Sequence, residues 1–272
     1  VIDNTMTAQS LAGFTTTGLV TFSKASGTAT LTGNISGSGL TVNATAGTLN
    51  LGSALTHTFS GNLTRTAGTL NLGSSTLRIA GSVSGTGGTF TASTGTVEYN
   101  GAAQSIVNLA YYGLSLSGSG TKTFAAATTV SNVIAIASGV NANLGTGFNH
   151  TSNGLSFAGT LQVIGSWGGT GSGAANVNTT YFVAATGKIN NNCSIPSITT
   201  QPTTPTATCS GSGTQTMTVV ASGSGITYSW RRGGVALTNG GVVSGQGTAT
   251  LTLTAPTAAE AGSYDVVVTG TC

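Results

Sequence analysis

Short stretches of alternating polar and apolar residues recur along the first two thirds of the chain. Residues 47–51 (Gly-Thr-Leu-Asn-Leu) and 68–72 (Gly-Thr-Leu-Asn-Leu) are the clearest examples. A period of two residues places alternate side chains on opposite faces of a β-strand. The pattern therefore predicts short strands, each with one face in a core and the other in water.

The glycine that opens this motif recurs at nearly constant spacing. It lies at positions 27, 47, 68 and 88 and again at 120, 139 and 159, so the steps are 20, 21 and 20 residues and then 19 and 20. Such a period is typical of a solenoid, in which each unit buries its apolar side by stacking on the next. A string of antiparallel β-sandwiches is the alternative, but a sandwich module needs about 100 residues.

We therefore predict an all-β protein whose main part is a right-handed parallel β-helix over residues 15–192, after an extended segment at 1–14. Prolines occur only at positions 196, 202, 205 and 256, which indicates a new module after residue 192. Residues 193–202 are expected to form a linker or first edge strand, and 203–272 a second domain. The residues expected to face into the solenoid are Leu49, Leu51, Leu70, Leu72, Phe90, Leu161 and Val163.

Composition supports strands and a folded core. Charged residues make up 4% of the chain, whereas hydrophobic residues make up 38% and glycine occurs 43 times. Soluble domains usually carry about 25% charged residues, so hydroxyl groups and backbone must supply the polar surface here. The abundant threonine and valine favour strands, and the apolar share is too large for a disordered chain.

The charge pattern argues against nucleic acid and membrane partners. The formal net charge is +3, but the seven cations are dispersed and only Arg231 and Arg232 are adjacent. A nucleic-acid interface requires clustered cations. No apolar run approaches the roughly 18 residues of a membrane helix, so we expect no membrane insertion.

Catalytic chemistry is not evident in the sequence. The positioned acids and bases available are Asp3, Glu98, Glu260, Asp265, His57 and His150. No two of the acids have a spacing that would pair them, and the two histidines are too far apart for a metal site. We therefore expect neither an enzyme nor a bound cofactor or metal, with His57 exposed on a strand and His150 exposed in a turn.

Aromatic residues offer a candidate binding surface. Tyr111, Tyr112 and Trp167 could contact a glycan, since flat rings bind sugars through apolar contact. The interpretation that we favour is that Trp167 and Phe182 close the last coil of the solenoid. Aligned threonine hydroxyls on a flat sheet, which could order ice, are a further and weaker alternative.

The second module resembles an immunoglobulin-like β-sandwich. Trp230 lies where strand C of that family carries its core tryptophan, and Tyr264 follows a turn like that of the family's tyrosine corner. Val219 and Val266 occupy the positions of the family's cysteine pair and would form the core together with Trp230 and Tyr264. The sequence given stops at Cys272, before the family's last strand. Either the polypeptide continues, or a strand from another copy, such as residues 1–8, completes the sandwich and builds a filament.

Taken whole, the chain resembles the giant surface adhesins of Bacteroidota that the type IX secretion system exports. The resemblance is carried by the Gly-Thr solenoid units, residues 95–101, 114–124 and 165–169, and the module from Ile198 to Cys272. It implies an extracellular, cell-surface protein linked to attachment or gliding motility. The expected function is a rigid spacer or fibre segment whose partners are neighbouring modules. The alternative is a module that binds a glycan or an abiotic surface through aromatic residues or threonine-rich faces.

The immunoglobulin-like strand order implies a disulfide pairing. Cys193 precedes strand A and would lie at the same end of the sandwich as Cys272, whereas Cys209 would lie at the opposite end. We therefore expect a Cys193–Cys272 disulfide. A Cys209–Cys272 pair is the alternative if the strand assignment is wrong.

Overall fold

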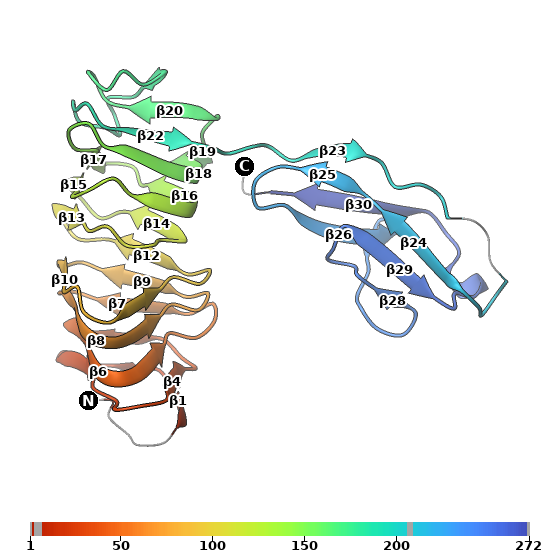
Figure 1. Ribbon diagram of the computed structural model, residues 1–272, viewed down its shortest axis with the longest axis horizontal. Helices are drawn as coiled ribbons and strands as arrows, with labels where there is room; N and C mark the ends of the chain where they lie inside the picture. Colours follow the sequence, from red (N-terminus) through yellow and green to blue (C-terminus); the bar gives the residue numbers. More distant parts are fainter. Residues whose placement is uncertain (1, 3–6, 206–208, 271–272) are drawn as a thin grey trace. The chain divides into compact units, whose positions relative to one another are not determined.

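The chain folds into two compact units, residues 1–192 and 193–272. The computed structural model describes residues 2, 7–205 and 209–270. The first unit is a β-solenoid of about 8 turns, as predicted, and the second is a smaller unit of antiparallel strands (Figure 1).

One wall of the solenoid is a 7-stranded sheet in which every strand pair is parallel. Its order is β1-β4-β6-β8-β10, with β3 on β6 and β11 on β8. The strands are β1 (Ala8–Leu11), β3 (Leu19–Phe22), β4 (Thr28–Leu31), β6 (Gly39–Asn50), β8 (Leu63–Asn71), β10 (Val83–Ser84) and β11 (Thr89–Thr91).

A second wall is a 12-stranded sheet that extends through both halves of the solenoid. Its order is β2-β5-β7-β9-β12-β14-β16-β18-β22-β20-β21, with β19 on β18. The strands are β2 (Phe14–Thr15), β5 (Ile35–Gly37), β7 (Thr56–Phe59), β9 (Thr76–Ile79), β12 (Thr96–Tyr99), β14 (Gly113–Leu116), β16 (Thr129–Ile136), β18 (Asn149–Phe157), β19 (Thr160–Leu161), β20 (Gly165–Gly168), β21 (Asn176–Val177) and β22 (Lys188–Asn191).

A third, 3-stranded parallel sheet takes the place of the first wall in the later coils. It contains β13 (Gln104–Ile106), β15 (Thr121–Phe124) and β17 (Asn141–Asn143). The first wall ends at β10 and β11, and no strand pairing joins either of them to β13. The two-residue alternation is visible in the burial of each short strand, since every second residue of β9 and β12 is buried.

A recurring Asn-Leu-Gly corner explains why consecutive coils turn at the same place. The Asn50 side-chain oxygen accepts a hydrogen bond from the Gly52 amide at 2.9 Å, and Asn71 accepts one from Gly73 at 2.8 Å. Gly73 has a φ of 60°, and a Cβ atom there would lie 2.0 Å from the Gly52 carbonyl oxygen. Only glycine fits such a position without displacing the coil below.

Apolar side chains form continuous columns inside the solenoid. Leu49 and Leu70 are paired in register on adjacent coils, and Leu70 is paired in turn with Phe90. Leu49, Leu51, Leu70 and Leu72 are all fully buried, as predicted, and Phe90 is partly buried against the same core. The stacking therefore places equivalent residues of successive repeats in contact.

The predicted inward positions of Leu161 and Val163 are wrong, because the chain forms a hairpin there instead of another coil. Leu161 is 42% exposed and Val163 is 67% exposed. Ala158 and Gly159 have φ values of 47° and 83°, and β19 pairs with β18 in antiparallel fashion. Two successive residues with positive φ are typical of a two-residue hairpin turn.

The amino-terminal residues that the structure describes already belong to the solenoid. Ile2 is buried and forms a bridge with Phe22, and β1 pairs with β4 along its whole length. The first coil therefore begins before residue 15. These contacts with the chain's own solenoid count against residues 1–8 completing a neighbouring copy, although residues 1 and 3–6 lie outside the described part.

The second unit contains three small antiparallel sheets. Its described core consists of Met217, Val219, Trp230, Leu251 and Leu253, against which Tyr264 and Val266 pack. The strands are β23 (Ser197–Thr200) with β25 (Val220–Ser222); β24 (Thr214–Thr218), β29 (Thr250–Thr254) and β28 (Val243–Ser244); and β27 (Val235–Ala236), β26 (Thr227–Arg232) and β30 (Tyr264–Thr269). A short 3-10 helix, η1 (Ala258–Glu260), precedes β30.

Candidate functional site

Tyr111, predicted as a possible glycan contact, is buried instead. Its side chain is part of the core, with the residue 1% exposed. Its hydroxyl donates to the Val107 carbonyl at 2.7 Å and lies 2.8 Å from the Tyr99 hydroxyl. The ring therefore cannot stack on a sugar, and of the adjacent pair only the partly buried Tyr112 has solvent access.

Trp167 belongs to an aromatic cluster around Phe157 near the last described coil. Phe157 contacts Trp167, Tyr181 and Phe182 at centroid distances of 5.4, 4.4 and 5.6 Å. Phe182 is buried and bridges to Ala142. This packing favours the interpretation that the aromatic residues close the end of the core.

Both histidines are buried, so their predicted exposure is wrong. The Nδ1 atom of His57 accepts a hydrogen bond from the Ile35 amide at 3.1 Å, and its Nε2 atom lies 2.8 Å from the Leu51 carbonyl oxygen. The ring must therefore be neutral, with its proton on Nε2. Burial lowers the pKa of His57, although the hydrogen bond to Leu51 opposes that shift.

His150 repeats this arrangement later in the solenoid. It accepts from the Thr128 amide at 3.2 Å and lies 2.9 Å from the Leu144 carbonyl oxygen. Burial lowers the pKa of His150 as well. The two histidines are thus equivalent structural residues that satisfy buried backbone groups at the Asn-Leu-Gly corner. A sequence signal for the burial of His57 is the two-residue alternation, which places it on the same strand face as Phe59.

Lys122 is an internal cation with its own cage of acceptors. Its ammonium group donates to the carbonyl oxygens of Gly101 at 2.6 Å and Ser119 at 3.1 Å, to that of Ala102, and to the Gln104 side chain at 3.0 Å. Burial lowers the pKa of Lys122. Its hydrogen-bonding capacity is therefore used to hold two successive turns together.

Arg78 and Glu98 form an ion pair between adjacent coils. The strands that carry them pair in register, and Arg78 Nε lies 3.0 Å from a Glu98 oxygen while Nη2 donates at 3.0 Å to the other. Ser117 on the next coil also donates to Glu98. The spacing of 20 residues between Arg78 and Glu98 is the sequence signal for this pair.

Arg65 is the cation whose hydrogen-bonding groups are least satisfied in the described part of the chain. The residue is only 6% exposed, and its Nε and Nη1 atoms are buried without a hydrogen-bond partner. Its guanidinium carbon lies 5.5 Å from the centre of the Phe90 ring. Arg65 lines a cavity of about 390 Å³ together with residues 83–86 and 107–109.

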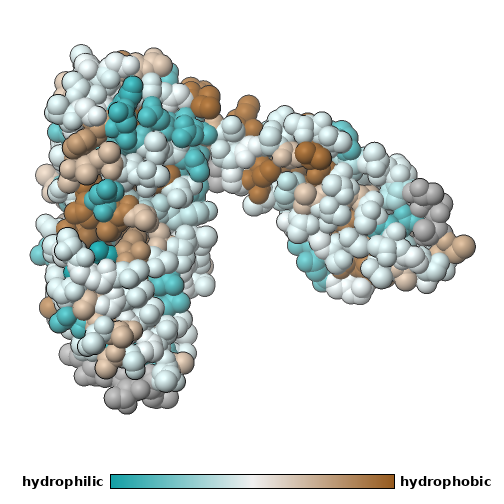
Figure 2. All heavy atoms as spheres, in the orientation of Figure 1, coloured by the Kyte–Doolittle hydropathy of each residue, from teal (hydrophilic) through white to brown (hydrophobic). Residues whose placement is uncertain are grey.

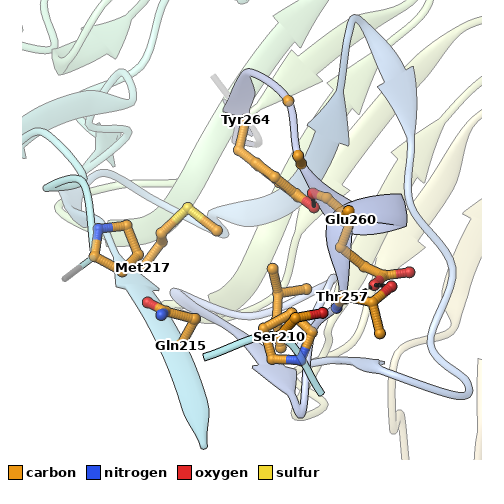
Figure 3. Close-up of a pocket in the computed structure, with 12 residues that line it drawn as sticks. Ser210, Gln215, Met217, Thr257, Glu260 and Tyr264 are labelled. Carbon is orange, nitrogen blue, oxygen red and sulfur yellow. Dashed lines mark hydrogen bonds between the residues drawn. The ribbon is translucent and has the colours of Figure 1, made fainter. Parts of the chain in front are cut away.

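A second cavity of about 440 Å³ lies in the second unit, between β24 and η1 (Figure 3). Its polar groups are engaged with one another, because Glu260 accepts from both the Thr257 amide and hydroxyl and the Tyr264 hydroxyl donates to the Glu260 carbonyl. The lining includes Pro205 and Ser210, on either side of residues 206–208, which lie outside the described part. The cavity therefore offers few free polar groups for a ligand.

Threonine side chains form a ladder along the first wall of the solenoid. Thr28, Thr48, Thr69 and Thr89 pair in register on four successive strands. On the face shown in Figure 2, much of the surface has intermediate hydropathy, with limited strongly hydrophilic and hydrophobic areas. Hydroxyl groups, and not charges, therefore provide much of the polar character of this wall.

Within residues 2, 7–205 and 209–270, no group of three or more His, Cys, Asp or Glu side chains is placed to hold a metal ion. No helix in the same residues is long and apolar enough to cross a membrane.

The cysteines are in two states. Cys193 is buried and disulfide-bonded, whereas Cys209 has a free thiol and is exposed. The predicted partner of Cys193, Cys272, lies outside the described residues, so the Cys193–Cys272 pairing stays a prediction.

Comparison with known proteins gives no relative. No protein-family model matches the chain, and neither a curated protein nor a solved structure matches it. Function must therefore be argued from the chain's own geometry.

Proposed function

We propose that the chain is a non-enzymatic structural segment of an extracellular bacterial adhesin or surface fibre, in which the solenoid acts as a rigid spacer or attachment element. The observation that carries this proposal is the continuous parallel ladder of β2-β5-β7-β9-β12-β14-β16-β18. Each coil contacts its neighbours through backbone hydrogen bonds and a shared apolar core. Such a stack holds its two ends at a fixed separation set by the number of coils.

The internal polar groups support a mechanical role. The buried His57, His150 and Lys122 side chains bind backbone groups of the solenoid itself. Arg78 and Glu98 pair across adjacent coils. These groups are used for cohesion between coils, and buried polar groups that are fully hydrogen-bonded favour a single rigid arrangement.

We further propose that the second unit is an immunoglobulin-like module. Strand β26 pairs with β30 so that Trp230 lies opposite Val266, which fits a strand C and strand F pair. The Tyr264 hydroxyl donates to the Glu260 carbonyl four residues upstream, as in a tyrosine corner. We also propose that the solenoid winds in a right-handed sense. The whole chain is proposed to resemble the Bacteroidota adhesins that the type IX secretion system exports.

Exchange of the solenoid in the protein that carries it tests the spacer function. The solenoid would be replaced by an unrelated β-solenoid with the same number of coils, and attachment of cells to a surface would be measured. A spacer requires length and stiffness only, so the exchange is expected to restore attachment that deletion abolishes. Failure of the exchanged, surface-displayed protein to attach would contradict the proposal.

The second candidate function is binding to a glycan or an abiotic surface. The threonine ladder from Thr28 to Thr89 is the observation that favours it, because it presents a regular array of hydroxyl groups. Saturable binding of the isolated chain on a glycan array, lost on substitution of Tyr112→Ala or Thr69→Ala, would support this candidate over the spacer.

A further inference from the structure

We propose that the cavity at Arg65 is a carboxylate-binding site that accepts a sugar acid of the uronic-acid class. The site goes beyond the spacer function and does not depend on it. It would give the solenoid a specific contact with an acidic glycan. The cavity lies at an interruption of the first wall, contains an unsatisfied cation and has walls that suit a sugar acid.

The cavity lies where the first wall of the solenoid is interrupted. Strand β10 is the last strand on its path, and β13 begins a separate sheet. Residues 107–109, which follow β13, line the cavity together with residues 83–86, and no strand pairing joins β13 to β10. A continuous ladder would have left no space of this size between two coils.

Arg65 supplies a positive charge that the chain itself does not neutralise. The cavity lining contains no acidic side chain, and the nearby Tyr99 and Tyr111 influence Arg65 electrostatically without being its hydrogen-bond partners. Burial raises the pKa of Tyr99 to about 12 and that of Tyr111 well above its usual value, so both hydroxyls stay neutral. A buried guanidinium without an anion is costly, and a bound carboxylate would remove that cost.

The chemistry of the walls selects among anions. A guanidinium group matches the planar geometry of a carboxylate and can donate two parallel hydrogen bonds to it. Val83, Val107 and Leu109 offer apolar contact for the C–H face of a ring, and Ser84 and Asn108 offer groups that can bind hydroxyls. The cavity of about 390 Å³ lies within the range of small-molecule sites.

The binding experiment uses the whole chain and three probes, which are glucuronate, its methyl ester, and acetate as a carboxylate without a ring. Binding would be followed by the arginine Nε–H resonances in ¹H–¹⁵N NMR spectra and by isothermal titration calorimetry. We expect glucuronate to shift the Arg65 resonance saturably, with a dissociation constant on the order of 1 mM for so small a ligand. The ester has the same ring but no charge, so it should bind at least about tenfold more weakly.

Variants separate the site from nonspecific binding. Arg65→Gln should abolish binding, whereas Arg78→Gln, which removes the same charge from an arginine already paired with Glu98, should leave it unchanged. Because Arg65 is buried and its loss could unfold the coil, Asn108→Trp provides a second variant. Asn108 is exposed, so this change should close the cavity and abolish binding while the circular dichroism spectrum stays native.

Four results would overturn the proposal. One is the absence of a saturable Arg65 shift at glucuronate concentrations of tens of millimolar. Another is equal binding of the ester, which would show that the carboxylate is not recognised. The third is equal binding of acetate, which would show that the ring contributes nothing and would refute the sugar-acid assignment. Retained binding in Asn108→Trp would likewise place the ligand elsewhere.

Discussion

Leu70 and Leu161 form a matched pair for testing how the repeat buries its apolar residues. Both follow the same Gly-Thr dipeptide, but Leu70 is fully buried and Leu161 is 42% exposed. Leu70 lies between Leu49 and Phe90 in a column fixed by the parallel register. Neighbours held in this way can collapse only partly into a cavity, so Leu70→Ala should destabilise the solenoid by about 3 kcal/mol, within the ~2–5 kcal/mol typical of buried leucine.

Leu161→Ala removes the same atoms from the hairpin β18–β19, where solvent already reaches the side chain. Its effect should stay within about 0.5 kcal/mol. Urea unfolding of the full chain, followed by far-ultraviolet circular dichroism, gives both values from the solenoid transition. Equal losses in the two variants, or a smaller loss for Leu70→Ala, would refute the assignment of inward and outward positions.

Three further predictions concern polar groups. The pKa values of His57 and His150 are lowered in the folded state, so their contribution to stability is present above the unfolded pKa of about 6.5 and is lost as pH falls below it. A His57→Gln/His150→Gln variant should therefore show a flatter dependence of the urea midpoint on pH between about pH 7 and 5. A double-mutant cycle of Arg78→Gln and Glu98→Gln should give a coupling of about 0.2–1 kcal/mol that shrinks in high salt, since Arg78 is partly exposed. Tyr264→Phe should destabilise the second unit by about 1 kcal/mol and leave the solenoid transition unchanged, because it removes a single hydrogen bond.

The sequence was informative about the solenoid because the same residue types return at each coil. The period near 20 residues brings Leu49 and Leu70 into register, and this pairing was predictable from spacing alone. The same reasoning failed at residues 158–163, where the motif is repeated but positive φ values at Ala158 and Gly159 reverse the chain. Backbone conformation at a non-glycine residue such as Ala158 is not evident from its identity.

Buried polar groups were the main feature that sequence reasoning missed. His57 and His150 occur among threonines and asparagines, so their polar type led to the expectation of exposure. The alternation itself places His57 on the same strand face as Phe59, and Lys122 on the same face as Phe124. Their burial depends on backbone amides and carbonyls at the corners, which become visible only once the coils are stacked. Arg65 was missed for a related reason, since its cavity exists only where one wall of the solenoid ends.

The central claim is that successive repeats stack as coils of one solenoid, and a distance between two spin labels tests it most directly. Thr15 and Ala135 lie on one register line that passes through Ser36, Thr58, Arg78, Glu98 and Ser115. With steps of about 4.8 Å between strands, their backbones should be about 29 Å apart. Labels attached to cysteines at these two positions, in a Cys209→Ser background, should give one narrow distance distribution near this value in double electron–electron resonance. A broad distribution, or a maximum far from it after allowance for the label arms, would contradict the stacked solenoid.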